Sequence, residues 1–278
     1  MSESKSKQEV KLKKIATKIT NLLPGKILIR GYPLNELIGN LSYAEMIYLC
    51  MKGELPSKNM GKMMDALILG ITDHGLVSAA TPPARIVVAG NPDPIKGICA
   101  GVLSVGPVTG SPKHSARFIS NAYELMKKNG WTKEQTADNI VNDYVSRKER
   151  IPGLGHPLFK DVDIRAARLR ELATAYGFAG EKLALYECIH SKFLNKINKK
   201  DIVINVDGMM AAIMCEMDFD EDMVDIMGVL SYLPGICAHT YEELKEKTSL
   251  GLIFQVNSIS EYVGVEERHL PKERIKES

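Results

Sequence analysis

The segment IPGLGHPLFKDVDIRA combines residue types that suit proton transfer next to an anionic ligand. His156 stands in a glycine-pinched turn, where an imidazole can exchange a proton at neutral pH. Gly153 and Gly155 let the backbone approach a ligand where a Cβ would clash. Lys160 and Arg165 supply cations suited to phosphate or carboxylate groups. Together these residues favour a site for an acidic acyl thioester.

The elements that position this segment are predicted to be helices almost throughout the chain. Ser42 and Glu45 have the spacing of a capping box, and they open a helix that ends near Gly53. Thr132 and Gln135 have the same spacing and predict a second capping box. Apolar residues at helical spacing predict further helices near residues 59–69, 163–176, 181–196, 208–217, 221–231 and 239–248. Strand-like alternation is confined to a short strand pair at residues 26–33, so the predicted fold class is all-α.

Composition narrows the classes of function. A chain of 278 residues can form one large core or two subdomains, and a formal charge of +2 gives no reason to expect a nucleic-acid partner. Five cysteines without CxxC spacing indicate reduced thiols and a cytoplasmic location. No apolar run approaches the roughly 18 residues that cross a membrane. The polar, lysine-rich N-terminus also lacks the apolar core of a signal peptide.

Four segments, in order along the chain, resemble the citrate synthase superfamily. They are RGYPLNELIGNLSYAEMIYLCMKGELP at 30–56, TDHGLVSAATPPARIVVAG at 72–90, GLGHPLFKDVDIRA at 153–166 and VINVDGMMAAI at 203–213. The short chain, the DHG variant and the NVDG form are similar to one branch of that superfamily, the citryl-CoA lyases and the C-terminal lyase module of ATP-citrate lyase. The resemblance covers most of the chain.

This resemblance implies a fold and an assembly. The fold is an all-α, citrate synthase-like structure with a large and a smaller helical domain and the active-site cleft between them. The boundaries predicted here are 1–109 and 221–278 for the large domain and 110–220 for the small domain. The assembly implied is a homodimer or higher homo-oligomer. Coenzyme A is implied as the thioester substrate or product.

The resemblance also implies three catalytic residues. His156 matches the family histidine that binds the hydroxyl or carbonyl oxygen of the acid, and in cleavage it would accept the hydroxyl proton. Asp207 matches the aspartate that exchanges a proton at the carbon next to the thioester, a step that needs a carboxylate held close to that carbon. His74, in DHG, matches a histidine that contacts the acid. The alternatives are a turn-stabilising histidine, a helix-capping aspartate and a histidine at a helix end.

Binding residues follow from the same alignment. Arg165 matches an arginine that binds one substrate carboxylate, where a planar fork suits a bidentate contact, and its alternative is an exposed helix charge. Lys160 matches a basic position that contacts CoA phosphates, with a solvated lysine as the alternative. Gly153 and Gly155 flank it as cofactor-binding glycines.

Three positions depart from the family pattern. Thr109 replaces a histidine that stabilises the enolate; its hydroxyl can donate one hydrogen bond but carries no charge. Tyr232 and Asn257 stand where arginines grip the carboxylates of the acid. A desolvated carboxylate without a cationic partner costs several kcal/mol, so we hypothesise an acceptor with fewer carboxylates than oxaloacetate. Arg165 would then be the one family arginine on the substrate.

The sequence therefore predicts an enzyme, a CoA-ester carbon–carbon lyase of the citryl-CoA lyase type. It would cleave citryl-CoA or a less carboxylated 3-hydroxyacyl-CoA to acetyl-CoA and a keto compound. One alternative is a citrate synthase-like enzyme acting in condensation, and another is a non-catalytic CoA-binding homologue. No HExxH or paired-ligand spacing is present, so we expect no metal and no redox cofactor. The expected partners are small molecules and further copies of the chain, with no nucleic acid and no membrane.

Overall fold

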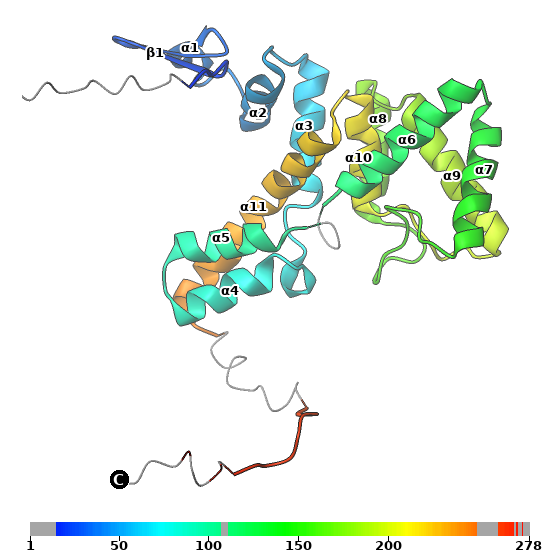
Figure 1. Ribbon diagram of the computed structural model, residues 1–278. Coiled ribbons are helices and arrows are strands. Elements are labelled where there is room, and N and C mark those ends of the chain that lie inside the picture. Colours follow the sequence, from blue (N-terminus) through cyan, green and yellow to red (C-terminus); the bar gives the residue numbers. More distant parts are fainter. Residues whose placement is uncertain (1–14, 107–110, 249–260, 270, 272–273, 275–278) are drawn as a thin grey trace, which may run out of the picture. The chain divides into compact units, whose positions relative to one another are not determined.

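The computed structural model describes residues 15–106, 111–248, 261–269, 271 and 274, and within them the chain is predominantly helical (Figure 1). In chain order the elements are β1 (Thr20–Leu23), β2 (Lys26–Ile29), β3 (Tyr32–Pro33), α1 (Leu34–Leu37), α2 (Tyr43–Lys52), α3 (Lys58–Gly70), η1 (Gly75–Val77), α4 (Thr81–Gly90), α5 (Pro94–Ser104), α6 (Lys113–Asn129), α7 (Lys133–Arg147), α8 (Ile164–Tyr176), α9 (Glu181–Ile197), α10 (Val206–Glu216) and α11 (Glu221–Glu246). The predicted all-α class is confirmed.

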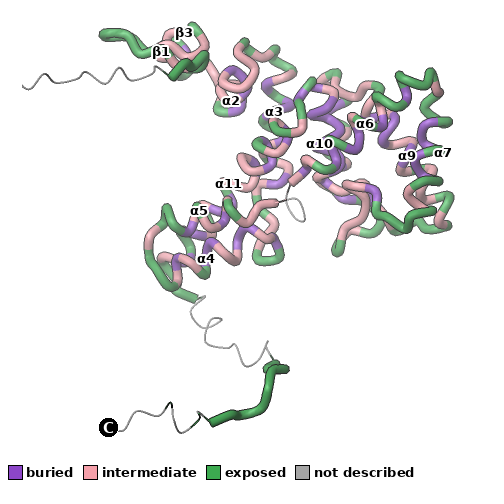
Figure 2. Tube along the Cα trace, viewed as in Figure 1, coloured by how far each residue is buried: buried purple, intermediate pink, exposed green. Residues whose placement is uncertain are grey.

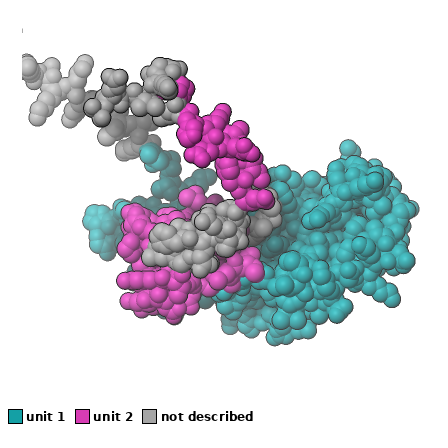
Figure 3. All heavy atoms as spheres, turned by 90° about the horizontal axis from the view of Figure 1, so that it is seen from below, with its two compact units in different colours: residues 1–74, 105–234 teal, residues 75–104, 235–278 magenta. Residues whose placement is uncertain are grey.

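The chain divides into two compact units (Figure 3). Unit 1 comprises Met1–His74 and Val105–Pro234, and unit 2 comprises Gly75–Ser104 and Gly235–Ser278. The domain boundaries expected from the sequence remain a prediction.

In unit 2, α4 packs on α5, and the guanidinium of Arg85 forms a 2.9 Å ion pair with Glu243, whose side chain is fully buried.

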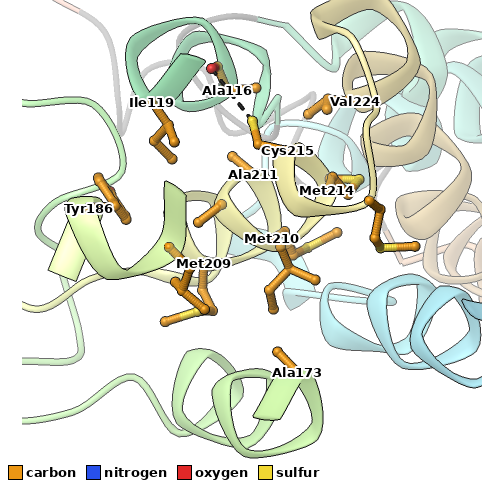
Figure 4. Packing of buried hydrophobic residues seen from close by; sticks show 14 of the residues in the cluster. Ala116, Ile119, Ala173, Tyr186, Met209, Met210, Ala211, Met214, Cys215 and Val224 are labelled. Atoms are coloured by element: carbon orange, nitrogen blue, oxygen red, sulfur yellow. Dashed lines mark hydrogen bonds between the residues drawn. The ribbon is translucent and has the colours of Figure 1, made fainter. Parts of the chain in front are cut away.

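The core of unit 1 surrounds α10. Val206 and every residue from Gly208 to Cys215 are buried, and α10 packs against α6, α8 and α9 (Figure 2). Figure 4 shows the side chains of this helix among Ile119 of α6, Ala173 of α8 and Tyr186 of α9. A helix that is apolar on all sides is stable only when enclosed. Enclosure therefore fixes the first turn of α10, which carries Asp207.

Local sequence signals set the helix ends. The capping boxes at Ser42 and Thr132 are both formed, with the side chain of each accepting a hydrogen bond from the third residue of its helix. Gly130 ends α6 and Gly177 ends α8 in the left-handed conformation that favours glycine. The two capping boxes lie where the sequence predicts them, because each is made by residues three positions apart.

The N-terminal strands form a three-stranded antiparallel sheet rather than the strand pair predicted at 26–33. Arg30 links this sheet to α2. Its Nε and Nη2 atoms donate to the carbonyl of Cys50 at 3.0 and 2.6 Å. The guanidinium thus satisfies the exposed carbonyl end of α2 and complements its dipole.

Two helical regions differ from the prediction. The stretches expected at 221–231 and 239–248 form one helix, α11, which continues through Pro234. Proline removes one helical hydrogen bond, but the flanking Met227, Ser231 and Ile236 are almost fully buried, and their packing outweighs that loss. Helices α4 and α5 were not predicted, since proline and glycine interrupt their sequences TPPARIVVAG and PIKGICAGVLS. Among the described residues, no helix combines the length and apolar character needed to cross a membrane.

Candidate active site

Backbone pairing brings the His156 loop next to the start of α10. Leu154 forms an antiparallel bridge with Ile204, and the Gly155 N–H donates to the carbonyl of Val203 at 2.7 Å. Both strands of this pairing belong to unit 1. The segments GLGH and NVDG, about fifty residues apart in the chain, therefore meet at one place.

Asn205 joins the two segments through its side chain. Its Oδ1 accepts from the Gly208 N–H at 3.0 Å and caps α10, while its Nδ2 donates to the carbonyl of Gly155 at 2.9 Å. Its own N–H donates to the carbonyl of Gly153 at 2.9 Å. One residue thus sets the position of the loop before His156 relative to the helix turn that carries Asp207.

The hydrogen bonds of His156 define what its ring can do. Its Nδ1 accepts from the backbone N–H groups of Leu158 and Phe159 at 3.1 and 3.2 Å. Because Nδ1 is an acceptor, the neutral ring carries its proton on Nε2. Nε2 lies 3.3 Å from Nη2 of Arg165. A guanidinium only donates, so a hydrogen bond between these two atoms would need the other tautomer, which the two backbone N–H groups that face Nδ1 disfavour. A neutral His156 can therefore donate a hydrogen bond to a substrate oxygen next to a guanidinium.

Arg165 is held by a buried carboxylate that the sequence did not single out. Its Nε donates to Oδ1 of Asp163 at 3.0 Å and its Nη2 to Oδ2 at 2.8 Å. Oδ2 also accepts from the Val206 N–H, at the start of α10, at 3.0 Å. Burial alone would raise the pKa of Asp163, but the hydrogen bonds and the charge of Arg165 hold it below its ordinary value. The Arg165 guanidinium is thereby fixed beside the Asp207 turn.

His74 follows α3 and lies against His156, with ring centroids 5.4 Å apart in an edge-to-face arrangement. Burial lowers the pKa of both histidines, and the charge of Arg165 lowers both further; the carboxylate of Asp163 partly opposes this. Both rings are therefore neutral at neutral pH. The structure brings together two neutral imidazoles and one guanidinium.

Asp207 occupies an apolar environment. Its Oδ1 is buried and accepts no hydrogen bond from the residues that the structure describes. Burial raises the pKa of its carboxyl from 3.8 to about 6; Arg165 lowers it and Asp163 raises it. A carboxyl with this pKa can gain or lose a proton near neutral pH, as a general acid or base requires.

Tyr232 on α11 is half-buried against the same core. Burial raises the pKa of its phenol, and the charges of Asp207 and Asp73 raise it further, whereas Arg165 lowers it. It thus carries a neutral hydroxyl near Asp207 and Arg165, at the position that the resemblance in sequence matches with a family arginine. Thr109 and Asn257, the other two departures, lie outside the described residues.

The two glycines of the loop differ in their surroundings. A Cβ on Gly153 would collide with the Tyr186 hydroxyl and would lie 2.5 Å from Cα of Gly208. Gly153 therefore allows the loop to contact α10 directly. At Gly155 the nearest atom to such a Cβ is Cγ2 of Ile202, 3.9 Å away, so space is open there.

That space belongs to a pocket of about 490 Å³ beside His156. Besides Gly155 and His156, its lining includes Arg150, Lys160 and the ring of Phe193. Lys160 is exposed and donates to the carbonyl of His156 at 3.0 Å. The lining contains two cations, Arg150 and Lys160, against one carboxylate, Glu149, and this net positive charge suits the phosphates of an anionic ligand.

Sequence reasoning missed Asp163 and Asn205 as site residues, although both stand within the quoted motifs. Asp163 precedes a helix at the N-cap position, which was the available signal.

In the part of the chain that the structure describes, no group of three or more His, Cys, Asp or Glu side chains is arranged so that it could hold a metal ion.

Residues 57–253 match the family described as "Citrate synthase, C-terminal domain". This match covers more than half of the 278 residues, and the chain belongs to the citrate synthase family. The predicted resemblance is confirmed.

Individual relatives agree with this assignment. The structure of citryl-CoA lyase from Hydrogenobacter thermophilus is 35% identical, with a TM-score of 0.84 over 93% of this chain and 98% of that one. ATP citrate lyase from Methanosaeta concilii, solved in complex with (3S)-citryl-CoA, shares the fold with a TM-score of 0.72 at 18% identity, covering 92% of this chain and 43% of that one. Citrate synthase 2 from Bacillus subtilis (strain 168) is 26% identical over 72% of this chain, and the chain spans 52% of its length.

The double role of Asn205 gives a stability prediction. Asn205→Ala should lower the free energy of unfolding by about 2 kcal/mol, because it removes both the cap of α10 and the bond to Gly155. Asn205→Ser should recover roughly half of that loss, since a hydroxyl caps a helix but is too short to reach the Gly155 carbonyl. Guanidinium titrations measure both changes.

A matched control is Ser57→Ala, which removes only the 3.2 Å cap bond from the Met60 N–H at the start of α3. Its expected cost is about 1 kcal/mol. If Asn205→Ala costs no more than Ser57→Ala, the bond between Asn205 and the loop contributes nothing.

Proposed function

We propose that this chain is a CoA-ester carbon–carbon lyase of the citryl-CoA lyase type. The observation that carries the proposal is the buried Asp207 carboxyl, whose pKa is raised to about 6, in the same unit as Arg165 and the two neutral histidines. A thioester lyase needs a proton donor for the carbon that leaves as acetyl-CoA and polar groups for the oxygen of the keto product. The similarity to citryl-CoA lyase at 35% identity supports the same class.

The cleavage begins at the 3-hydroxyl group of the substrate. As the bond between C2 and C3 breaks, its electron pair moves into the thioester enolate and the hydroxyl oxygen becomes a carbonyl. Nε2–H of His156 donates to this oxygen, beside Arg165. The sequence assigned acceptance of the hydroxyl proton to His156, but its Nδ1 bonds leave no lone pair on Nε2 in the neutral ring. We therefore assign proton acceptance to the neutral His74 alongside it.

Asp207 completes the reaction at carbon. In its protonated form it gives its proton to C2 of the enolate, which yields acetyl-CoA and leaves Asp207 as a carboxylate. The proton held by His74 and the one missing from Asp207 are then exchanged with solvent. In condensation the same carboxylate would remove the proton from acetyl-CoA. A pKa of about 6 allows either direction near neutral pH.

The CoA portion of the substrate is proposed to extend from His156 along the pocket of about 490 Å³. Arg150 and Lys160 line it and suit the CoA phosphates, while Phe193 offers an apolar surface. Gly155 has open space in front of its backbone, which allows a ligand to approach closely. Gly153 instead allows the loop to pack closely against α10.

The acid portion is proposed to bind between Arg165, His74 and Tyr232. Arg165 already shares two of its nitrogens with Asp163, and Tyr232 is uncharged at neutral pH. A pocket with one shared guanidinium favours a substrate with few carboxylates, because each further desolvated carboxylate needs its own cationic partner. The proposed substrate is accordingly citryl-CoA or a less carboxylated 3-hydroxyacyl-CoA.

A direct assay tests the function. The purified chain should release acetyl-CoA from a 3-hydroxyacyl-CoA ester without ATP and without added metal. Citryl-CoA should be compared with 3-hydroxyacyl-CoA esters that carry one carboxylate or none on the acceptor part. Efficient turnover of citryl-CoA with the others inert would contradict the low-carboxylate reading of Tyr232. No acetyl-CoA release from any of these esters would contradict the lyase.

The condensation direction is the second candidate, because the curated relatives that match include citrate synthases. The same residues serve both directions, and the assay distinguishes them when acetyl-CoA and a keto acid are supplied instead. The family resemblance also supports our proposal of a homodimer working in the cytoplasm.

A further inference from the structure

Asp163 has more partners than a helix cap needs. Its side chain is fully buried, and its Oδ1 accepts from the N–H and the Nε of Arg165 at 3.1 and 3.0 Å. Its Oδ2 accepts from Nη2 of Arg165 at 2.8 Å and from the Val206 N–H at 3.0 Å. One carboxylate thus caps the start of α8, orients a guanidinium and holds the first turn of α10.

We propose that Asp163 is a positioning residue that fixes Arg165, the anchor for the substrate acid, relative to Asp207, the proton donor to the acetyl carbon. The two groups lie on different helices, α8 and α10, which pack against each other. The core of apolar side chains around α10 sets the helix as a whole (Figure 4). Asp163 is the polar link between the two helix starts, since it bonds to the residue immediately before Asp207. This inference rests on the proposed function.

The Asp163 carboxylate also affects the pKa of Asp207 through its negative charge. The groups that bear on Asp207 are Asp163 and Arg165 beside α8, the phenol of Tyr186 on α9 and the phenol of Tyr232 on α11. Of the two charged groups, Arg165 favours the ionised form of Asp207 and Asp163 opposes it. Asparagine at position 163 keeps a side-chain oxygen that accepts from Arg165, so the guanidinium would stay near with its charge uncompensated, and Asp207 would ionise at lower pH.

Asp163→Asn tests the proposal with a readout that needs no catalysis. In a chain labelled at its aspartate carboxyl carbons, NMR titration follows the Asp207 carboxyl, which is assigned by its absence in Asp207→Asn. We expect a midpoint near 6 in the unaltered chain and a midpoint lower by about half a unit or more in Asp163→Asn. Cleavage needs protonated Asp207, so the alkaline limb of the kcat profile should move to lower pH by the same amount.

The matched control is Asp161→Asn, which removes an exposed carboxylate two positions earlier. It should leave the Asp207 titration and the kcat profile unchanged. Asp163→Ser retains a helix-capping hydroxyl and carries the same test if Asp163→Asn does not fold. A shifted titration in a chain that cleaves no thioester would support the link between Asp163, Arg165 and Asp207 while the proposed function fails. An unshifted titration together with an unchanged kcat would overturn the inference.

Discussion

Asp207→Asn is expected to lose most of the turnover and at the same time to stabilise the folded chain at neutral pH. The amide cannot give a proton to the enolate carbon, and general acid–base catalysis contributes typically a factor of about 10² to 10⁴. Binding of the CoA thioester should change little. Loss of turnover with unchanged CoA binding also distinguishes an enzyme from a non-catalytic CoA-binding homologue. Such a homologue would show no turnover even before the substitution.

The gain in stability follows from the direction of the pKa shift. Burial raises the pKa of Asp207 from 3.8 to about 6, so the folded chain holds this proton more tightly than the unfolded chain does. Stability is therefore lost as the pH rises between these two values, and the loss at neutral pH is about 3 kcal/mol, because each unit corresponds to about 1.4 kcal/mol. Asparagine carries no charge at any pH and avoids that loss.

Thermal denaturation at neutral pH and near pH 4 measures this effect. Asp207→Asn should melt at a higher temperature than the unaltered chain at neutral pH, and the difference should shrink toward zero at the lower pH. Asp201→Asn, at an exposed position in the segment just before α10, is the control and should show no such dependence. A lower melting temperature for Asp207→Asn at neutral pH would mean that the carboxylate is stabilised by partners rather than penalised by burial.

The sequence predicts well those features that depend on neighbouring residues. The capping boxes at Ser42 and Thr132 and most helix bounds follow from side chains a few positions apart, and the structure confirms them. The family motifs also identify His74, His156, Arg165 and Asp207, and the structure places them in one unit. Their catalytic roles remain proposals.

Features that depend on distant residues were not predictable in this way. The Asp163 carboxylate bonds to Val206, which is 43 positions away, and Asn205 bonds to Gly155, which is 50 positions away. Nothing in the residue types alone states that these partners meet. Helix α11 illustrates the same limit, because Pro234 predicts a break and only tertiary burial of its neighbours keeps the helix continuous. Sequence patterns indicate the local preference for helix or turn, and tertiary packing can override that preference.

Gly153→Ala is expected to destabilise the chain far more than Gly155→Ala, although the family resemblance implies the same cofactor-binding role for both glycines. Both have positive φ, 76° at Gly153 and 92° at Gly155, so an alanine at either site costs about 1–2 kcal/mol in backbone strain. Only at Gly153 does the new methyl group also meet packed atoms. These include the Tyr186 hydroxyl, Cα of Gly208 at 2.5 Å and Oγ of Ser115 at 2.9 Å.

Overpacking of this kind adds about 1–3 kcal/mol, so the total for Gly153→Ala is roughly 2–5 kcal/mol, against about 1–2 kcal/mol for Gly155→Ala. The Tyr186 hydroxyl is a removable part of the obstruction, whereas Cα of Gly208 is not. Gly153→Ala should therefore cost less in a Tyr186→Phe background, by an amount that a double-mutant cycle in guanidinium measures. The recovery should be partial, because the backbone of α10 stays in place. Equal losses for the two glycine variants would show that the loop does not pack on α10, and the link between His156 and Asp207 would then rest on hydrogen bonds alone.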